Sequence, residues 1–535
     1  MPEEAAYRLS DSTAAEPLVN DWVAWSHVIS PVACSLHLRN YQMGVLRSYV
    51  EDPKAHVEAC KYPELRSGRF VDIPGHRAAE VRDFLAGTEA RMRDNLKLAA
   101  SLIEFHNRLT EQAKGLSLDP YYAELPPELQ GHVELVYDYY NRPTVRLYES
   151  LLYESNYYKE DLQSLRLFRQ ARDDSRPFFM STPRLFEEKQ IAWDVPFRSP
   201  QVDELFALDD SPKPLGHVRE LLGLRPADDR LLLEMLEEGA APRPERWGGE
   251  RGVRVRYIGH ACVLVEWGGV SVLTDPCLGI IPAEGGSERF TYRDLPERID
   301  YVLITHNHHD HFCVESLLRL RHKIGCLVVP RAAGYVYGDV SLKLMAKKIG
   351  FENVVEIDAL ESIKLPGGEI VGIPFMGEHA DLAHGKTAYA VLARGASMLF
   401  AADSDCLDVN MYRHVRRILG PMRAVFLGME CVGAPLSWSC GTFLPQKPEH
   451  SIDQSRRYKG CDSVRGSRLL EAVGAERIFV YAMGLEPWLE HLLGLAYRPE
   501  ATQLREAKQL LAHARERGFT DARLLSGKCE IHLSD

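Results

Sequence analysis

The sequence lacks the features that mark membrane and secreted proteins. No stretch approaches the roughly 20 consecutive apolar residues that a bilayer-spanning helix needs. The N-terminal residues, Met-Pro-Glu-Glu-Ala-Ala, contain no apolar core of a secretory signal. The 11 cysteines are scattered, without the paired CxxC spacing of a zinc ribbon. We therefore expect a cytoplasmic protein with reduced thiols and no membrane association.

Basic residues are also scarce relative to acidic ones. The chain has 64 Lys and Arg against 76 Asp and Glu, a formal net charge of -12. A protein that coats nucleic acid needs a basic face to neutralise phosphates, so we expect no nucleic-acid partner. At 535 residues, with 45% hydrophobic and 26% charged residues, the chain is typical of a globular protein with more than one core.

The first half of the chain has mainly helical patterns. Apolar residues recur at steps of three or four from Ala78 to Leu109, which predicts an amphipathic helix. The tyrosine-rich stretch Val133–Tyr158 is interrupted by Pro143 and predicts two further helical segments. Its tyrosines suit either an interface or ordinary packing.

A Gly- and Pro-rich run, Gly239–Glu250, predicts a linker between two domains. We place a mainly helical domain at residues 1–245 and a second domain at residues 246–535. Beyond the linker the apolar pattern alternates, and Gly268-Gly269 separates two such runs as in a β-hairpin. Strands then alternate with helices, which predicts an α/β fold with two sheets packed between helical layers, an αββα sandwich.

The expected strands of this second domain lie at Val253–Ile258, Cys262–Trp267, Val270–Thr274, Tyr301–Thr305, Cys326–Val329, Val354–Ile357, Ala388–Leu392, Met398–Ala401, Val425–Gly428 and Ile478–Tyr481. The expected helices begin near Phe312, Tyr335, Val409 and Ser463, and a last one runs from about Ala501 to Arg517.

A histidine-rich motif, Thr-His-Asn-His-His-Asp-His, follows the apolar strand Tyr301–Ile304. Side chains two residues apart at a strand end point the same way, so His306 and His308 can bind one metal ion together. Asp310 and His311, where the chain turns into the next helix, can hold a second ion. The competing interpretation is a histidine-rich surface loop. We expect His309 to face outward.

The motif resembles the signature of the metallo-β-lactamase superfamily. Further landmarks of that superfamily stand in order around it: Gly259-His260-Ala261, Thr274-Asp275-Pro276 and Phe400–Ser404. The resemblance implies that Asp403 bridges two metal ions and that Asp275 orients a ligating histidine. We interpret His260 as a core histidine rather than a functional one.

Two departures from the hydrolases of that superfamily bear on the chemistry. The segment after the motif reads Gly-Glu-His-Ala-Asp from Gly377, and no histidine stands where the last ligand belongs, directly after the late strand Ile478–Tyr481. If Glu378 ligates instead of His379, three imidazoles and three carboxylates surround the metals. More oxygen ligands favour iron or manganese over zinc.

This combination is similar to the diiron β-hydroxylases of non-ribosomal peptide synthesis. The resemblance implies that His306, His308 and Glu378 hold one iron, that Asp310 and His311 hold the other, and that Asp403 bridges them. It implies two oxo-bridged iron ions as cofactor, with dioxygen as co-substrate. Catalytic roles fall to Glu378 and to Glu430, which would contact the substrate's amine or be an ordinary strand-end charge.

The implied function is oxygen-dependent β-hydroxylation of an aromatic amino acid, L-p-aminophenylalanine, in chloramphenicol-type antibiotic biosynthesis. The amino acid is held as a thioester on the phosphopantetheine arm of a synthetase carrier domain. An external electron donor and a homodimer, built through the N-terminal domain, are further implied partners. The alternatives are a dinuclear zinc or manganese hydrolase, which needs His379 as a ligand, and an assembly protein with a vestigial site.

Carrier domains are usually acidic, so an acidic enzyme needs a local basic surface to bind one. Each candidate surface could equally be a solvated helix face. The candidates are Arg319, Arg321 and Lys323; Arg413, Arg416 and Arg417; and Arg456, Arg457 and Lys459.

Overall fold

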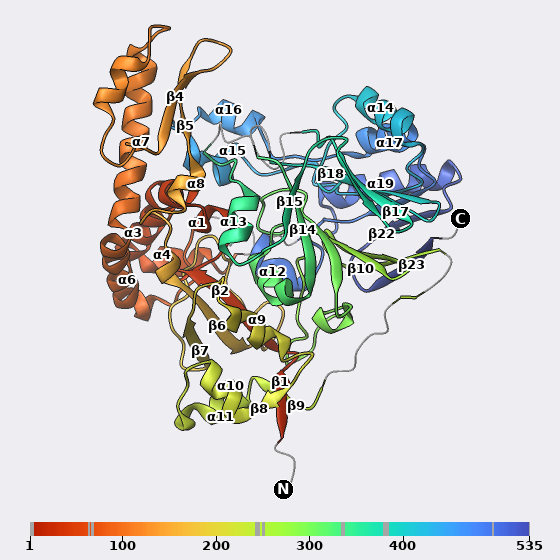
Figure 1. The fold of residues 1–535 in the computed structure, drawn as a ribbon, viewed down its shortest axis with the longest axis horizontal. Coiled ribbons are helices and arrows are strands. Elements are labelled where there is room, and N and C mark those ends of the chain that lie inside the picture. Colours follow the sequence, from red (N-terminus) through yellow and green to blue (C-terminus); the bar gives the residue numbers. More distant parts are fainter. Residues whose placement is uncertain are drawn as a thin grey trace.

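The computed structural model describes residues 5–62, 65, 69–240, 247–248, 252–332, 337–377, 385–494 and 497–533, without the side chains of residues 438–439. Two sheets of seven strands dominate the second half of the described chain. Figure 1 shows them with helices on their outer sides. The expected α/β class and αββα sandwich are confirmed.

The first sheet contains the hairpins predicted from the alternating pattern. Its β11–β12 turn, Gly268-Gly269, has positive φ at both residues (49° and 82°), as a tight two-residue hairpin requires. In order across the sheet the strands are β15 (Val354–Ile357), β14 (Ile324–Pro330), β13 (Ile299–Leu303), β12 (Val270–Thr274), β11 (Cys262–Trp267), β10 (Val253–Gly259) and β23 (Cys529–Leu533).

The second sheet begins with antiparallel strands and continues with parallel ones. In order its strands are β16 (Ser362–Leu365), β17 (Gly368–Ile373), β18 (Ala388–Ala393), β19 (Ala396–Phe400), β20 (Ala424–Leu427), β21 (Arg477–Val480) and β22 (Asp521–Leu524). Strands β16, β17, β22 and β23 were not predicted from the sequence.

Alternate residues of the facing strands fill the space between the sheets, among them Val255, Val263, Tyr389 and Phe426. The outer face of the second sheet packs against α14 (Val409–Leu419), α17 (Ser463–Val473) and α19 (Thr502–Glu516). The outer face of the first sheet packs against α12 (Val314–Leu320), α13 (Leu342–Lys348) and the N-terminal half.

The N-terminal half combines helices with small sheets. Its helices include α1 (Ser26–Ile29), α2 (Pro31–His37), the π-helix η1 (Leu38–Gln42), α3 (Met43–Glu51), α4 (Pro53–Ala59), α6 (Ala78–Arg91), α7 (Arg93–Gln112), α8 (Glu149–Leu152), α9 (Pro200–Ala207), α10 (Leu215–Leu221) and α11 (Asp229–Leu233). The small sheets are formed by β1 (Ala6–Leu9), β8 (Lys213–Pro214) and β9 (Leu236–Glu238), and by β2 (Thr13–Val19), β3 (Trp22–Val23), β6 (Gln163–Arg169) and β7 (Gln190–Asp194).

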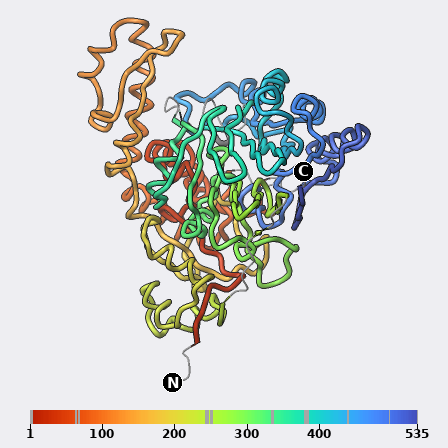
Figure 2. Tube along the Cα trace, turned by 45° about the vertical axis from the view of Figure 1, so that its right-hand side comes forward, coloured from red at the N-terminus to blue at the C-terminus, as the bar shows by residue number. Residues whose placement is uncertain are grey.

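The helical prediction for Val133–Tyr158 is wrong over most of its length. The segment forms a hairpin of β4 (Val133–Tyr137) and β5 (Pro143–Leu147). Asp138 stabilises its turn by accepting hydrogen bonds from backbone N–H groups of residues 140 and 142 at 2.8 and 2.9 Å. Pro143 is tolerated because it opens a strand that pairs on one side only. In Figures 1 and 2 this hairpin and the end of α7 project from the body.

The helix predicted over Ala78–Leu109 divides into α6 and α7 at Met92. Among the described residues, no helix has the length and apolarity needed to cross a membrane.

Candidate metal centre

The histidine motif lies where β13 ends, at the mouth between the two sheets. The start of the loop is fixed to the first sheet, because Ile304 N donates to Val328 O of the neighbouring strand at 2.9 Å. Tyr389 of the second sheet donates its hydroxyl to Ile304 O at 2.8 Å. On the outside, Ser26 Oγ of α1 donates to Asn307 O at 3.0 Å. Both sheets and the N-terminal half therefore hold the loop.

Four strands that end near this loop are followed by non-glycine residues in the left-handed region. They are His260, Asp275, Ala402 and Ala482, with φ of 52°, 32°, 45° and 52°. Ala482 N donates to His260 O at 3.0 Å, which joins two of these turns. Such conformations cost on the order of 1–3 kcal/mol each and persist where the surroundings enforce them, commonly at functional sites.

His311 is the centre of the cluster. Its Nδ1 lies 2.9 Å from Asp275 Oδ2, and Asp275 also accepts from Thr305 N and Thr305 Oγ1, both at 2.7 Å. With its Nδ1 proton donated to Asp275, His311 directs Nε2 at two other carboxylates, 3.0 Å from Asp403 Oδ2 and 3.5 Å from Asp310 Oδ2. Asp275 thus orients His311 as the resemblance implied.

His306, His308 and Asp403 complete the side of the site that faces the second sheet. The ring centroid of His306 lies 4.0 Å from that of His311 and 4.7 Å from that of His308. His306 Nε2 is 3.7 Å from Asp403 Oδ2. Gly428 gives Asp403 its room, because a Cβ there would lie 2.8 Å from Asp403 Oδ1.

His260 is the site residue that the sequence interpretation missed. Its Nε2 lies 2.8 Å from Asp310 Oδ2, and it groups with Asp310 and His311 within metal-ligand spacing. A second such group contains His306, His311 and Asp403. The signal available in the sequence was its place in a Gly-His-Ala turn at the end of the first predicted strand.

The electrostatics of the cluster are those of a cation site. Burial alone would lower the pKa of His311, but Asp310, Asp403 and Asp275 outweigh it and hold that pKa well above its ordinary value. Burial would raise the pKa of Asp310, but His311 and His260 hold it well below the usual range. Negative charge thus accumulates around a few imidazoles in a buried space.

The donor set fits a pair of metal ions. His311 Nε2 is buried and has no hydrogen-bond partner among the described residues, although it is aimed between two carboxylates. His311 belongs to both groups of three residues that have metal-ligand spacing. Imidazole nitrogen with carboxylate oxygen is a donor set that suits iron.

Glu378 and His379 lie outside the described residues, so which of the two binds a metal stays a prediction. His309 does not face outward as expected. Its Nε2 lies 2.8 Å from Leu492 O and its ring packs 4.2 Å from that of Phe179, because the N-terminal half covers this side of the loop.

Glu430 follows β20, and hydrogen bonds from three nearby residues fix its carboxylate. It accepts from Tyr497 Oη at 2.9 Å, from Gln503 Nε2 at 3.0 Å and from Gly433 N at 2.9 Å. The Gly460 N–H donates to the Glu430 carbonyl at 2.7 Å, and a Cβ on Gly460 would lie 3.0 Å from the Asp403 carbonyl. One glycine therefore brings the backbones of Glu430 and Asp403 together.

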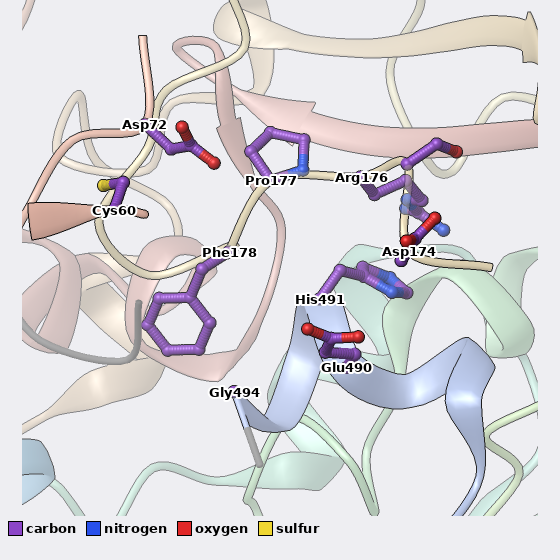
Figure 3. A pocket seen from close by; sticks show the side chains of 10 residues that line it. Cys60, Asp72, Asp174, Arg176, Pro177, Phe178, Glu490, His491 and Gly494 are labelled. Atoms are coloured by element: carbon purple, nitrogen blue, oxygen red, sulfur yellow. The ribbon is translucent and has the colours of Figure 1, made fainter. Parts of the chain in front are cut away.

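A cavity of about 270 Å³ lies between residues of the N-terminal half and a short C-terminal helix (Figure 3). The loop residues Arg176, Pro177 and Phe178 line one side, and Glu490 and His491 of α18 (Glu490–Leu493) line the other. Because Arg176 is bonded to Glu16 and Glu315, this cavity belongs to the joint between the two halves.

The first half of the chain matches the model of the diiron non-heme beta-hydroxylase N-terminal domain over residues 8–240. Over 530 residues the chain is 35% identical to the 4-amino-L-phenylalanyl-[CmlP-peptidyl-carrier-protein] 3-hydroxylase of Streptomyces venezuelae, covering 97% of this chain and 98% of that relative. The chain belongs to the diiron non-heme β-hydroxylases. It is thus a member of an enzyme family whose cofactor is a pair of iron ions.

Structural similarity to this β-hydroxylase family extends over both halves. The crystal structure of CmlA, a diiron beta-hydroxylase from Streptomyces venezuelae, matches with a TM-score of 0.92 and 32% identity, covering 99% of this chain and all of that one. Residues 254–391 match the beta-lactamase superfamily domain. A metal-dependent hydrolase from Methanopyrus kandleri is 29% identical over 161 residues, 28% of this chain and 62% of that relative.

One of the three basic clusters is not a docking surface. Arg319, Arg321 and Lys323 are buried and pair with acidic residues of the N-terminal half. The pairs are Arg319 with Asp209 at 3.3 Å, Arg321 with Asp203 at 2.8 Å, and Lys323 with Asp210 at 2.8 Å. Arg413, Arg416 and Arg417 of α14 are exposed.

Proposed function

We propose that this β-hydroxylase adds a hydroxyl group to the β-carbon of L-p-aminophenylalanine held as a thioester on a synthetase carrier domain, in antibiotic biosynthesis. The observation that carries the proposal is the meeting of His306, His311, Asp310 and Asp403 in a chain 35% identical, over 97% of its length, to a hydroxylase of that carrier-bound amino acid.

We assign His306, His308 and Glu378 to one iron, Asp310 and His311 to the other, and Asp403 to both. Bound there, the iron pair supplies the activation of dioxygen that hydroxylation requires. The protein's own residues prepare the site. Asp275 fixes the Nδ1 proton of His311 and leaves Nε2 for the metal. His260, at 2.8 Å from Asp310, orients that carboxylate or binds with it.

The N-terminal half excludes water from one side of the site. Trp25 lies against His309, with ring centroids 5.8 Å apart, and α1 bonds to the loop through Ser26. Exclusion of water matters because an oxidant formed without substrate attacks its surroundings. We therefore assign residues 1–245 a share of the substrate cleft, with residues 246–535 as the catalytic domain.

For Glu430 we propose the role of receiving the substrate's amine. Glu430 follows the end of β20, and Gly460 brings its backbone close to that of Asp403. The hydrogen bonds from Tyr497 and Gln503 would hold it in place while an ammonium group approaches.

Three further proposals concern the surroundings of the enzyme. The projecting hairpin exposes Tyr139 and Tyr140, beside the exposed Leu116, which suits a homodimer interface. Reduction of the irons needs an external electron donor. No disulfide bond joins the cysteines of the described residues, which favours a reducing compartment, the cytoplasm.

Metal analysis and optical spectroscopy on protein produced with iron test this function. We expect two irons per chain, an oxo-bridged ferric absorption and, with reductant and dioxygen, a gain of one oxygen atom by the carrier-bound amino acid. Glu378→Ala should lose most of the iron, whereas His379→Ala should keep it. Two zinc ions with hydrolysis of the thioester, or the opposite ranking of the variants, would overturn the proposal in favour of a hydrolase.

A further inference from the structure

A second cavity, of about 440 Å³, lies at the seam between the two halves of the chain. One wall is formed by η1, with Arg39 and Asn40, and the other by the segment that includes Thr442 and Lys447. Asn40 Nδ2 donates to Thr442 O at 2.7 Å, which ties the walls together. The cavity therefore exists only where both halves meet.

The charge of this groove is positive. Arg39, Arg69 and Lys447 line it, and none of the three forms an ion pair with a carboxylate in the described part of the chain. Its acidic member is Asp453, whose two oxygens accept from Ser437 N at 2.6 Å and Ser437 Oγ at 2.8 Å. His450 also lines it. Three cations around a groove are suited to an anion such as a phosphate.

The groove's inner wall leads toward the metal loop. Phe443, next to Thr442, packs its ring 4.5 Å from that of His27. His27 belongs to α1, is buried, and lies near enough to His308 and His309 to interact with them electrostatically. One layer of side chains thus separates the groove wall from a proposed iron ligand.

Buried polar groups without partners lie along this inner layer. Both ring nitrogens of His27, both of His37 and the hydroxyl of Tyr41 have no hydrogen-bond partner among the described residues. The His37 ring lies 6.4 Å from that of His27 and 5.0 Å from that of Tyr41. Buried polar atoms are nearly always hydrogen-bonded, so these atoms point to a polar ligand.

The chemistry of that ligand follows from the unpartnered atoms. They are four imidazole nitrogens and one phenol hydroxyl, which can donate or accept hydrogen bonds. They suit amide and hydroxyl groups.

We propose that the groove binds the phosphopantetheine arm of the carrier domain, with its phosphate at Arg39, Arg69 and Lys447 and its amides at His27, His37 and Tyr41. This proposal rests on the proposed function and places the arm between the surface and the metal centre. The arm carries a phosphate at one end, followed by uncharged amides. This order matches the groove, which holds the cations, and its inner layer, which holds the unpartnered polar atoms.

Kinetics with the loaded carrier test the proposal. The triple variant Arg39→Ala/Arg69→Ala/Lys447→Ala should raise KM about tenfold with kcat retained, since charge-assisted contacts to one phosphate are lost. Arg230→Ala, which removes an exposed cation on α11, is the control and should change neither constant. An unchanged KM in the triple variant would overturn the groove assignment.

Two competing probes isolate the phosphate. Free 4′-phosphopantetheine should inhibit the wild type about tenfold better than pantetheine, and the triple variant should lose this preference. Equal inhibition of the wild type by both, or inhibition by neither, would sink the groove assignment while hydroxylation persists. Failure to hydroxylate the loaded carrier at all would instead refute the proposed function.

Discussion

The two large sheets have the same number of strands, but their outer faces are covered in different ways. The second sheet is covered by α14, α17 and α19, all of which connect its own strands along the chain. The first sheet shares a single continuous core with the N-terminal half, in which Leu264, Val302 and Leu327 pack with residues such as Trp22 and Leu98. The N-terminal half is therefore a structural layer of the metal domain rather than an appendage.

This difference in what covers the two sheets explains why one basic cluster is buried and another is exposed. On α12, between the first sheet and the N-terminal half, Arg319 is buried and paired. On α14, which faces solvent, Arg413 and Arg417 are exposed. The same local pattern of basic residues acquires opposite roles because one helix lies inside a shared core and the other forms the outside of the molecule.

Removal of the N-terminal half should have the largest effect. Residues 246–535 alone would expose the apolar outer face of the first sheet, including Leu264, Leu273 and Val302. We expect this fragment to aggregate or to bind hydrophobic dyes, measured by soluble yield and dye fluorescence against the full chain. A soluble fragment with a single cooperative melting transition would show that the shared core is dispensable.

Glu16→Ala should produce the next largest effect. Glu16 on β2 is buried between Arg184, at 2.8 Å, and Arg176, at 2.6 Å, and Arg176 also bonds to Glu315 of α12 at 2.7 Å. Its loss leaves buried cations short of a partner, which costs about 3–5 kcal/mol of unfolding free energy, measured by urea denaturation. Glu89→Ala, which breaks an exposed pair with Arg47, should change little.

Glu149, at the contact between the two halves of the chain, should make the stability of the protein depend on pH. It accepts from Ser30 Oγ at 3.1 Å and from Ser341 N of the other half at 2.9 Å, and burial raises its pKa from 4.5 to about 7. The folded chain thus holds a proton that the unfolded chain has lost between these values. The contribution of Glu149 to stability should be highest below pH 4.5 and fall by about 3 kcal/mol as pH rises to 7.

Denaturation of Glu149→Gln across this pH range is the corresponding measurement. The amide cannot lose a proton, so this contribution to the pH dependence should disappear. An unchanged slope in the variant would show that other groups cause it.

The smallest effect should separate α12 from α14 directly. Lys323→Met, just after α12, removes a cation that lies 2.8 Å from Asp210 and should cost about 1 kcal/mol. Arg413→Met on exposed α14 should leave the free energy of unfolding nearly unchanged. Equal effects in thermal melting would contradict the distinction between a shared and a solvent-facing layer.

The sequence was most informative where local pattern decides the structure. Alternation predicted β10 to β12 with their Gly268-Gly269 turn, and an apolar strand before the histidines predicted where the candidate metal-binding side chains gather. The strands β16 and β17 were also within reach, since Pro366-Gly367 separates two short alternating runs. The β4–β5 hairpin was not predicted because the alternation of Val133 and Leu135 covers only a short run beside several tyrosines.

Other features depend on residues far apart in the chain. His260 meets Asp310 across 50 positions, and Arg321 meets Asp203 across 118. The Gly-His-Ala turn is the one local signal at His260, and the pattern around Arg321 does not distinguish it from a solvated arginine. The order of strands in the first sheet brings His260 and Asp310 together, whereas the packing of that sheet against the N-terminal half brings Arg321 to Asp203.

The left-handed turns at His260, Asp275, Ala402 and Ala482 have a further consequence. Since the packing of the strands imposes these conformations, the backbone itself positions His260, Asp275 and the neighbouring Asp403. The choice between metals then depends on the side chains rather than on the backbone. A scaffold of this kind can exchange one chemistry for another by replacing a single coordinating group.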